Sequence, residues 1–322
     1  MAEADNFTPA AAPGSYDTVS TQEAYVEHLL GYIDVSALQP MTIVCNAGNG
    51  GAGRVIDALE PHLPFRFIKV HHEPDGHFPN GVPNPLLVEN RASTSDRVIA
   101  ENADLGIAWD GDFDRCFFYD HTGEFIEGYY VVGLLASAFL AKTPNQIVIH
   151  DPRLTWNTID VAEAGGGRAE QSKTGHAFIK ETMRHFDAVY GGEMSAHHYF
   201  RDFAYCDSGM IPWLLVTEIM STTGKTLAEL VEARTKAFPC SGEINRTVSD
   251  APALIAKVES MYSDAAKSIE HMDGLSLGFD EWRFNLRMSN TEPVVRLNVE
   301  TRGDDALMRA KTEELLGIID SF

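Results

Sequence analysis

The chain has 322 residues, with 47 acidic against 25 basic side chains and a formal net charge of −22 at pH 7. A surface this acidic argues against nucleic-acid and anionic-membrane partners, so small anionic substrates must be bound by local basic clusters. The length exceeds what one hydrophobic core normally serves and predicts two or three domains. The four cysteines form no Cys-x-x-Cys pair, the first residues show no basic region followed by an apolar core, and no apolar run has the length of a bilayer span. These features predict a cytoplasmic protein without disulfides or zinc.

The first part of the chain has the pattern of an α/β domain. Residues 1–15 are small and Pro-containing and are expected to be a linker or leader. Hydrophobic periodicity then predicts helices over 21–33, 54–63 and 93–102, alternating with strands over 41–45, 65–71 and 105–109. This order predicts a largely parallel sheet in a domain over 16–124. The glycines of 46–53 fit neither a P-loop nor a strict Gly-x-Gly-x-x-Gly pattern, so tight packing of helix on strand is their expected role.

The strand over 105–109 leads directly into Asp110-Gly-Asp-Phe-Asp-Arg115, which we call the metal loop. Gly111 gives the backbone the freedom to turn, so that three alternate carboxylates can face one point. Three hard oxygen ligands suit Mg²⁺, which keeps open positions for water or a substrate phosphate. The predicted metal ligands are therefore Asp110, Asp112 and Asp114.

The acidic pattern of the metal loop has other interpretations. An EF-hand needs Gly at its sixth position and Glu at its twelfth, where this chain has Arg115 and His121. An aspartyl-phosphate phosphatase, with Asp110 as the nucleophile, is an alternative that the pattern leaves open. A solvated acidic turn is a further alternative in so acidic a chain.

The α/β pattern begins again after residue 124 and changes at residue 239. Periodicity predicts helices over 129–141, 157–164, 177–186, 210–220 and 227–238, and strands over 146–150, 168–172 and 188–190. A second domain, a three-layer α/β unit like the first, is therefore expected over 125–238. Strands are then expected near 242–248, 275–278, 281–288 and 294–300, with helices over 253–269 and 304–319. This order predicts a smaller α+β domain with an antiparallel sheet over 239–322.

Two polar loops lie in the predicted second domain. Lys173-Thr-Gly-His176, the Lys173 loop, lies between a strand and a helix, where a cation and helical N–H groups can share an anion, although a plain capped turn explains it equally well. Gly192-Glu-Met-Ser-Ala-His-His198, the sugar loop, follows a strand. Its Glu193 and Ser195 are two residues apart and face the same side in an extended chain, which suits vicinal sugar hydroxyls. A histidine beside them can carry protons.

A third polar loop, Arg287-Met-Ser-Asn-Thr-Glu-Pro293, joins two predicted strands of the last domain, and we call it the phosphate loop. Guanidinium, hydroxyl, amide and backbone N–H groups can all donate to phosphate oxygens. A plain hairpin loop is the alternative. The candidate anion-binding residues are Arg287, Ser289, Asn290, Thr291 and Arg296.

In order and spacing, the four loops resemble the α-D-phosphohexomutase superfamily, and within it the bacterial phosphomannomutase/phosphoglucomutase family, from about residue 16 to the end. Enzymes of that family have four domains, and this chain resembles the second, third and fourth. The resemblance implies Mg²⁺ on the three aspartates and charge balance by Arg115. It implies that Glu193 and Ser195 hold the sugar hydroxyls. It assigns substrate contact or proton transfer to Lys173, His176 and His197, and it places the non-reacting phosphate on Arg287, Ser289, Asn290 and Thr291.

The implied activity interconverts hexose 6-phosphate and hexose 1-phosphate, with mannose or glucose as the sugar, as in GDP-mannose synthesis. A hexose 1,6-bisphosphate intermediate exchanges a phosphoryl group with a phosphoserine, which lies in a Thr-Ala-Ser-His-Asn-Pro loop of the family's first domain. No Ser-His pair occurs in this sequence. We therefore expect a truncated mutase with little turnover of its own, and self-association through the face that the missing domain would leave. A non-catalytic sugar-phosphate binder or partner-dependent subunit is the alternative.

Overall fold

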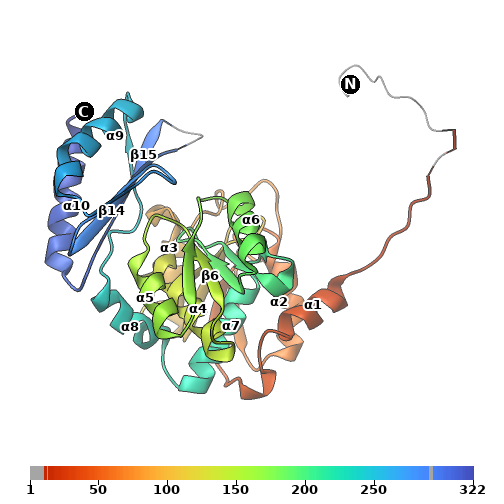
Figure 1. The fold of residues 1–322 in the computed structure, drawn as a ribbon. Helices are drawn as coiled ribbons and strands as arrows, with labels where there is room; N and C mark the ends of the chain where they lie inside the picture. Colours follow the sequence, from red (N-terminus) through yellow and green to blue (C-terminus); the bar gives the residue numbers. More distant parts are fainter. Residues whose placement is uncertain (1–10, 13, 290–292) are drawn as a thin grey trace.

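The computed structural model describes residues 11–12, 14–289 and 293–322, and the description below refers to these residues. Figure 1 shows two α/β units side by side and a third unit, coloured blue, whose helices α9 and α10 cover one face of its sheet. Each unit contains one five-stranded sheet. None of the helices in the described residues is both long enough and apolar enough to span a bilayer.

The first sheet has the order β2-β1-β3-β4-β5. Strands β2, β1 and β3 are parallel, and β4 and β5 extend the sheet with antiparallel pairings. Every residue of β3 is buried, and the strand ends where the metal loop begins. The elements are α1 (Gln22–Leu30), β1 (Thr42–Asn46), α2 (Ala52–Leu59), β2 (Arg66–Val70), α3 (Ala92–Glu101), β3 (Leu105–Trp109), β4 (Cys116–Tyr119) and β5 (Phe125–Ile126).

The second sheet has the order β10-β9-β8-β6-β7, with β7, β6 and β8 parallel and β9 and β10 antiparallel. One hydrophobic core joins it to the first unit. For example, the Trp109 indole donates to the Gly209 carbonyl at 2.8 Å. The elements are α4 (Gly128–Lys142), β6 (Ile147–His150), α5 (Trp156–Ala164), β7 (Arg168–Gln171), α6 (His176–Phe186), β8 (Tyr190–Gly192), β9 (His198–Phe200), β10 (Cys206–Asp207), α7 (Ile211–Thr223) and α8 (Leu227–Ala237).

The third sheet is antiparallel throughout, in the order β11-β15-β14-β13-β12, and has a hydrophobic core of its own. The predicted fold class, two α/β units followed by an α+β unit with an antiparallel sheet, is confirmed. The elements are β11 (Ile244–Thr247), α9 (Ala251–Tyr262), β12 (Ser268–Glu270), β13 (Leu275–Gly278), β14 (Trp282–Met288), β15 (Val294–Thr301) and α10 (Asp305–Asp320).

Two sequence predictions of the elements were wrong. The helix expected over 253–269 begins at Ala251 and ends at Tyr262, because a short 3₁₀ turn follows and residues 268–270 then form β12 against β13. The strand expected over 188–190 begins only at Tyr190. Its first two residues lie between the end of α6 at Phe186 and the strand, and the Ala188 amide donates to the Met183 carbonyl at 2.9 Å.

Candidate functional site

Three of the four loops are joined by hydrogen bonds that involve backbone amides. The metal loop follows β3, the sugar loop connects β8 and β9, and the Lys173 loop lies between β7 and α6. The Cys116 amide donates to the Ala196 carbonyl at 3.1 Å, which fixes the end of the metal loop against the sugar loop. The Gly175 amide donates to Glu193 Oε1 at 3.0 Å, which holds the Lys173 loop against the same segment. The carboxyl ends of parallel strands therefore bring these loops to one place.

The metal loop gathers its three carboxylates as predicted. Oxygen atoms of Asp110, Asp112 and Asp114 lie within 4.8 Å of one another. Asp110 is buried, and its Oδ2 accepts from Arg115 Nε at 2.6 Å. This burial and pairing argue against Asp110 as an exposed nucleophile, and so against the phosphatase alternative.

The pKa of Asp114 supports a cation site. Burial is the largest cause that raises this pKa, His197 opposes the rise, the carboxylates of Asp110, Asp112 and Asp207 add to it, and the net pKa is about 6. A bound divalent cation would relieve the mutual repulsion of these carboxylates. The donor set consists of hard oxygen ligands, so the residues present fit such an ion.

Two of the glycines of 46–53 pack against the metal loop, whereas the sequence predicted packing of helix on strand for them. A Cβ at Gly50 would lie 2.4 Å from the Gly111 carbonyl oxygen, and a Cβ at Gly51 would lie 2.5 Å from the Phe113 ring. Only residues without a Cβ allow the metal loop to lie this close to the turn. The turn over 46–53 therefore packs directly against the metal loop.

Glu193 of the sugar loop is almost completely buried and makes several contacts. Its Oε2 accepts from the Tyr199 hydroxyl at 2.6 Å and lies 3.3 Å from His197 Nδ1, while Oε1 lies 3.7 Å from Arg153 Nη2. Burial alone would raise the pKa of Glu193, but His197, Arg153 and Tyr199 outweigh it and lower this pKa to about 2. Glu193 is therefore ionised at neutral pH.

His197 connects the sugar loop to the metal loop. Its Nε2 lies 3.6 Å from Asp114 Oδ1, and its Nδ1 lies 3.3 Å from Ser195 Oγ. Burial lowers the pKa of His197, but the carboxylates of Glu193 and Asp114 more than offset this, and the net shift is upward. The imidazole is thus held closer to its protonated form than a free histidine.

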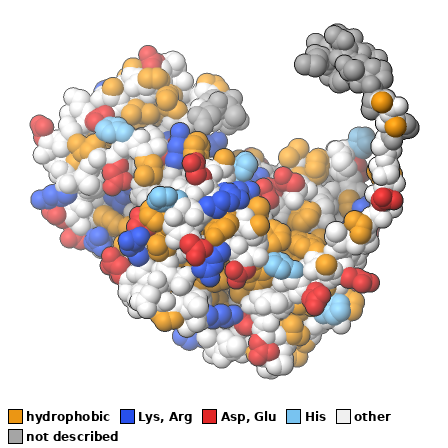
Figure 2. Space-filling model, turned by 45° about the vertical axis from the view of Figure 1, so that its right-hand side comes forward, with side chains coloured by type: hydrophobic (Ala, Val, Ile, Leu, Met, Phe, Trp, Pro, Cys, Tyr) orange, Lys and Arg blue, Asp and Glu red, His pale blue; other side chains and the backbone are white. Residues whose placement is uncertain are grey.

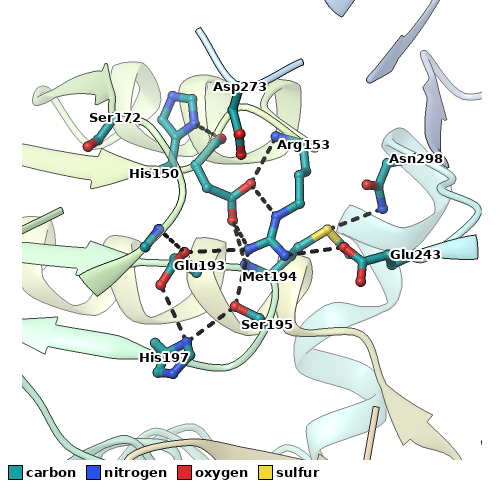
Figure 3. A network of polar contacts seen from close by, with 12 residues as sticks. His150, Arg153, Ser172, Glu193, Met194, Ser195, His197, Glu243, Asp273 and Asn298 are labelled. Atoms are coloured by element: carbon teal, nitrogen blue, oxygen red, sulfur yellow. Dashed lines mark hydrogen bonds and ion pairs between the residues drawn. The ribbon is translucent and has the colours of Figure 1, made fainter. Parts of the chain in front are cut away.

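Arg153, which sequence reasoning missed, lies at the centre of the polar network in Figure 3. Its side chain is 2% exposed, and its Nε and Nη2 donate to Asp151 at 3.0 and 2.9 Å. Nη2 also lies 3.1 Å from Ser195 Oγ, and Nη1 lies 3.4 Å from Glu243 Oε2. A usable signal was present, because Asp151-Pro-Arg153 directly follows strand β6, next to the strands that end in the other loops.

Arg287 of the phosphate loop and Arg296 of β15 meet this network at Glu243, which lies between α8 and β11. Arg287 Nη2 lies 3.0 Å from Glu243 Oε2, and Arg296 Nη1 lies 3.5 Å from Oε1. Of the other predicted phosphate ligands, Ser289 is described and its amide donates to Val294. Asn290 and Thr291 lie outside the described residues.

Lys173 and His176 make fewer contacts with the other predicted site residues than the sequence led us to expect. Both side chains are exposed, and the Lys173 ammonium lies 5.0 Å from the Phe178 ring centroid. Across residues 14–289 and 293–322, no hydrogen bond or ion pair joins either side chain to another predicted site residue. Their loop meets the site through the backbone of Gly175.

A cavity of about 510 Å³ lies where the three units meet. Its lining includes Arg115 of the metal loop, Met194 of the sugar loop, and Glu243 and Arg296 of the third unit. Figure 2 shows the molecule hollowed between the third unit and the body, with Lys and Arg side chains beside the hollow. This size and this mixture of carboxylates and guanidinium groups suit a small polyhydroxylated anion.

Comparisons with known proteins agree with this geometry. Models of phosphoglucomutase/phosphomannomutase match the chain in three parts: alpha/beta/alpha domain II over residues 23–123, alpha/beta/alpha domain III over 127–238, and the C-terminal domain over 243–316. A protein of Xanthomonas campestris pv. campestris named "Phosphohexose mutases" is 63% identical over 296 residues, which are 92% of this chain and 66% of the relative. The chain thus spans slightly less than two thirds of that relative's length.

Two further similarities cover nearly the whole chain. A Salmonella montevideo protein named "Phosphomannomutase" is 60% identical over 328 residues, which are 100% of this chain and 72% of the relative. The crystal structure of a phosphoglucomutase/phosphomannomutase family protein from Burkholderia thailandensis superimposes with a TM-score of 0.81 at 29% identity. It covers 95% of this chain and 66% of that one.

Proposed function

We propose, given that this chain belongs to the phosphoglucomutase/phosphomannomutase family, that it binds a phosphohexose in the cavity between its three units. The reaction to which this binding contributes interconverts hexose 6-phosphate and hexose 1-phosphate. The observation that carries the proposal is the continuous network from Asp114 through His197, Ser195, Arg153 and Glu243 to Arg287. It joins the proposed cation site to the proposed anion site, and one of its members, Glu243, lines the cavity. We also propose domain boundaries near residues 124 and 238.

The metal loop is the proposed Mg²⁺ site, with Asp110, Asp112 and Asp114 as ligands. When bound, Mg²⁺ would supply positive charge that offsets the charge of a transferring phosphoryl group. Arg115, paired with Asp110 at 2.6 Å, would balance the charge of the loop and hold that carboxylate in place. The three convergent carboxylates support this assignment.

The sugar is proposed to lie against Glu193 and Ser195, which share Arg153 as a neighbour. Arg287, Ser289 and Arg296 would bind the phosphate that does not react, together with the family's Asn290 and Thr291 positions. Because carboxylates on two sides favour its protonated form, His197 is the proposed proton donor to the sugar oxygen. Lys173 and His176 are proposed to contact substrate from the edge of the site.

We further propose that the 322 residues alone bind the sugar phosphate with little or no mutase turnover. The support is that no Ser-His pair, such as the family's phosphoserine loop contains, occurs in the sequence. A hexose 1,6-bisphosphate would then bind without receiving or giving a phosphoryl group. The same residues would serve a sugar-phosphate-binding subunit that depends on a partner. We propose the cytoplasm as the compartment, since all four cysteines are free thiols.

A coupled assay of mannose 1-phosphate conversion, with Mg²⁺ and a hexose 1,6-bisphosphate activator, tests this proposal. We expect no turnover above the background of the Asp112→Ala variant, together with a rise in melting temperature when mannose 6-phosphate is added. Turnover at the rate of a whole mutase, abolished by Asp112→Ala, would refute the claim about this chain alone. Absence of thermal protection at millimolar ligand would refute the binding site itself.

A further inference from the structure

Glu243 lies among three guanidinium groups that come from different parts of the fold. Its carboxylate is 3.0 Å from Arg287, 3.4 Å from Arg153 and 3.5 Å from Arg296. The side chain is 14% exposed, and it belongs to the connection between α8 and β11 rather than to any of the four loops. Burial raises the pKa of Glu243, but the three arginines outweigh this and lower it, so the carboxylate is ionised.

The guanidinium groups around Glu243 can donate more hydrogen bonds than a single carboxylate accepts. Arg287 is 8% exposed, and its buried Nε has no hydrogen-bond partner in the described residues. A carboxylate offers two oxygens and one negative charge. A phosphate monoester offers three oxygens and nearly two charges at neutral pH, in a geometry that matches the guanidinium fork.

We propose that Glu243 is an internal anion that occupies the position of the ligand phosphate and must be displaced before a sugar phosphate binds. This inference rests on the proposed function, which places that phosphate at Arg287 and Arg296. Glu243 also lines the cavity of about 510 Å³, so space for the displaced carboxylate adjoins the cluster.

The consequence is a charge threshold for the ligand. A dianionic phosphate interacts with the three arginines more strongly than the Glu243 carboxylate does and replaces it. A neutral sugar offers no charge, and a monoanionic sugar sulfate carries only as much charge as Glu243 itself, so neither displaces it. Glu243 therefore makes the site selective for phosphate esters, at the expense of absolute affinity.

Displacement also changes how the units are held together. Glu243 links Arg153 of the second unit to Arg287 and Arg296 of the third sheet. A phosphate in the same position contacts both sides and replaces that link. The ligand would thus substitute one ionic bridge between the units for another.

The test is isothermal titration calorimetry at pH 8, with glucose 6-phosphate and glucose 6-sulfate as probes. The variant Glu243→Gln keeps the size of the side chain and removes its charge. Its matched control is Glu232→Gln, an exposed glutamate on α8 that pairs with Lys236. We expect Glu243→Gln to bind glucose 6-phosphate about tenfold or more tightly than wild type, which corresponds to about 1.4 kcal/mol. We also expect it to gain measurable binding of glucose 6-sulfate, and the control to match wild type.

Weaker or unchanged phosphate binding by Glu243→Gln, with a wild-type circular dichroism spectrum, would overturn the inference. It would show that Glu243 positions the arginines for the ligand. Should that variant not fold, Glu243→Asp retains the charge on a shorter side chain, and the same reasoning requires it to bind more tightly than wild type. If no form of the protein binds glucose 6-phosphate, the proposed function fails. If wild type binds and the variants do not bind more tightly, only the inference fails.

Discussion

The buried pair of Arg283 and Glu300 fixes the segment that carries Arg153. Glu300 is completely buried on β15, and its Oε1 accepts from Arg283 Nη1 at 2.8 Å and from the Thr155 amide at 2.7 Å. The Tyr129 hydroxyl donates to Oε2. Arg283 also donates to the carbonyl of Arg153 at 3.0 Å. The third sheet therefore fixes the backbone of residues 153–155, which includes Arg153, the central arginine of the site.

Replacement of Glu300 by Gln tests this clamp. The amide keeps the shape of the side chain but leaves Arg283 buried without a counter-charge, and breaking a buried pair on one side costs about 3–5 kcal/mol. This is a large share of the roughly 5–15 kcal/mol that stabilises a typical protein. The comparison variant Tyr129→Phe keeps the ion pair and removes one hydroxyl, so it should cost about 1–3 kcal/mol.

Urea denaturation at pH 7, followed by circular dichroism, measures both losses, and calorimetry establishes whether the units unfold together. The expected order of stability is wild type, then Tyr129→Phe, then Glu300→Gln. A Glu300→Gln variant within about 1 kcal/mol of wild type would contradict the buried-pair reasoning, since that loss is well below the cost of an uncompensated buried charge. Equal losses in the two variants would show that the hydroxyl, and not the charge, matters.

Two further predictions concern single residues. Gly50→Ala places a Cβ 2.4 Å from the Gly111 carbonyl oxygen, a backbone atom that cannot rotate away. We expect the free energy of unfolding, measured by urea denaturation, to fall by about 1–3 kcal/mol, and Mg²⁺-dependent ligand binding to weaken. The control Gly76→Ala should show neither effect, because its Cβ meets no atom within 4 Å. Burial lowers the pKa of His198 to about 3 from its ordinary 6.5, so unfolding takes up a proton and stability falls as pH drops between these values. The slope of stability against pH should become shallower in His198→Gln by up to about 1.4 kcal/mol per pH unit between pH 6 and 4, and equal slopes would refute this.

Helices and strands could be predicted from the sequence where all their residues are buried and polar residues flank both ends. The strand over 105–109 was predicted without error because all five residues are apolar or small and acidic residues flank them. The helix over 253–269 was predicted too long, because Ala265, Ala266 and Ile269 continue its apolar spacing although the backbone turns after Tyr262.

The centre of the site could not be predicted in the same way. Arg153 contacts Ser195, which is 42 residues later, and Glu243, which is 90 residues later. No local pattern records such pairings. Glu243 is one of 47 acidic residues and has no motif around it. The loops could be predicted because each concentrates polar groups at a strand end. Asp151-Pro-Arg153 also follows a strand end, but its pairing with Ser195 and Glu243 is not visible in the sequence, and Glu243 is isolated.

The central claim is that Arg287 binds the phosphate of a phosphohexose in a site shared by the three units. Calorimetric titration of mannose 6-phosphate into wild type, Arg287→Met and the exposed control Arg309→Met tests it most directly. We predict saturable binding to wild type and to the control, and a loss of at least about tenfold in Arg287→Met, because a buried charge contact to the ligand is removed. Equal affinity of Arg287→Met and wild type would contradict the account.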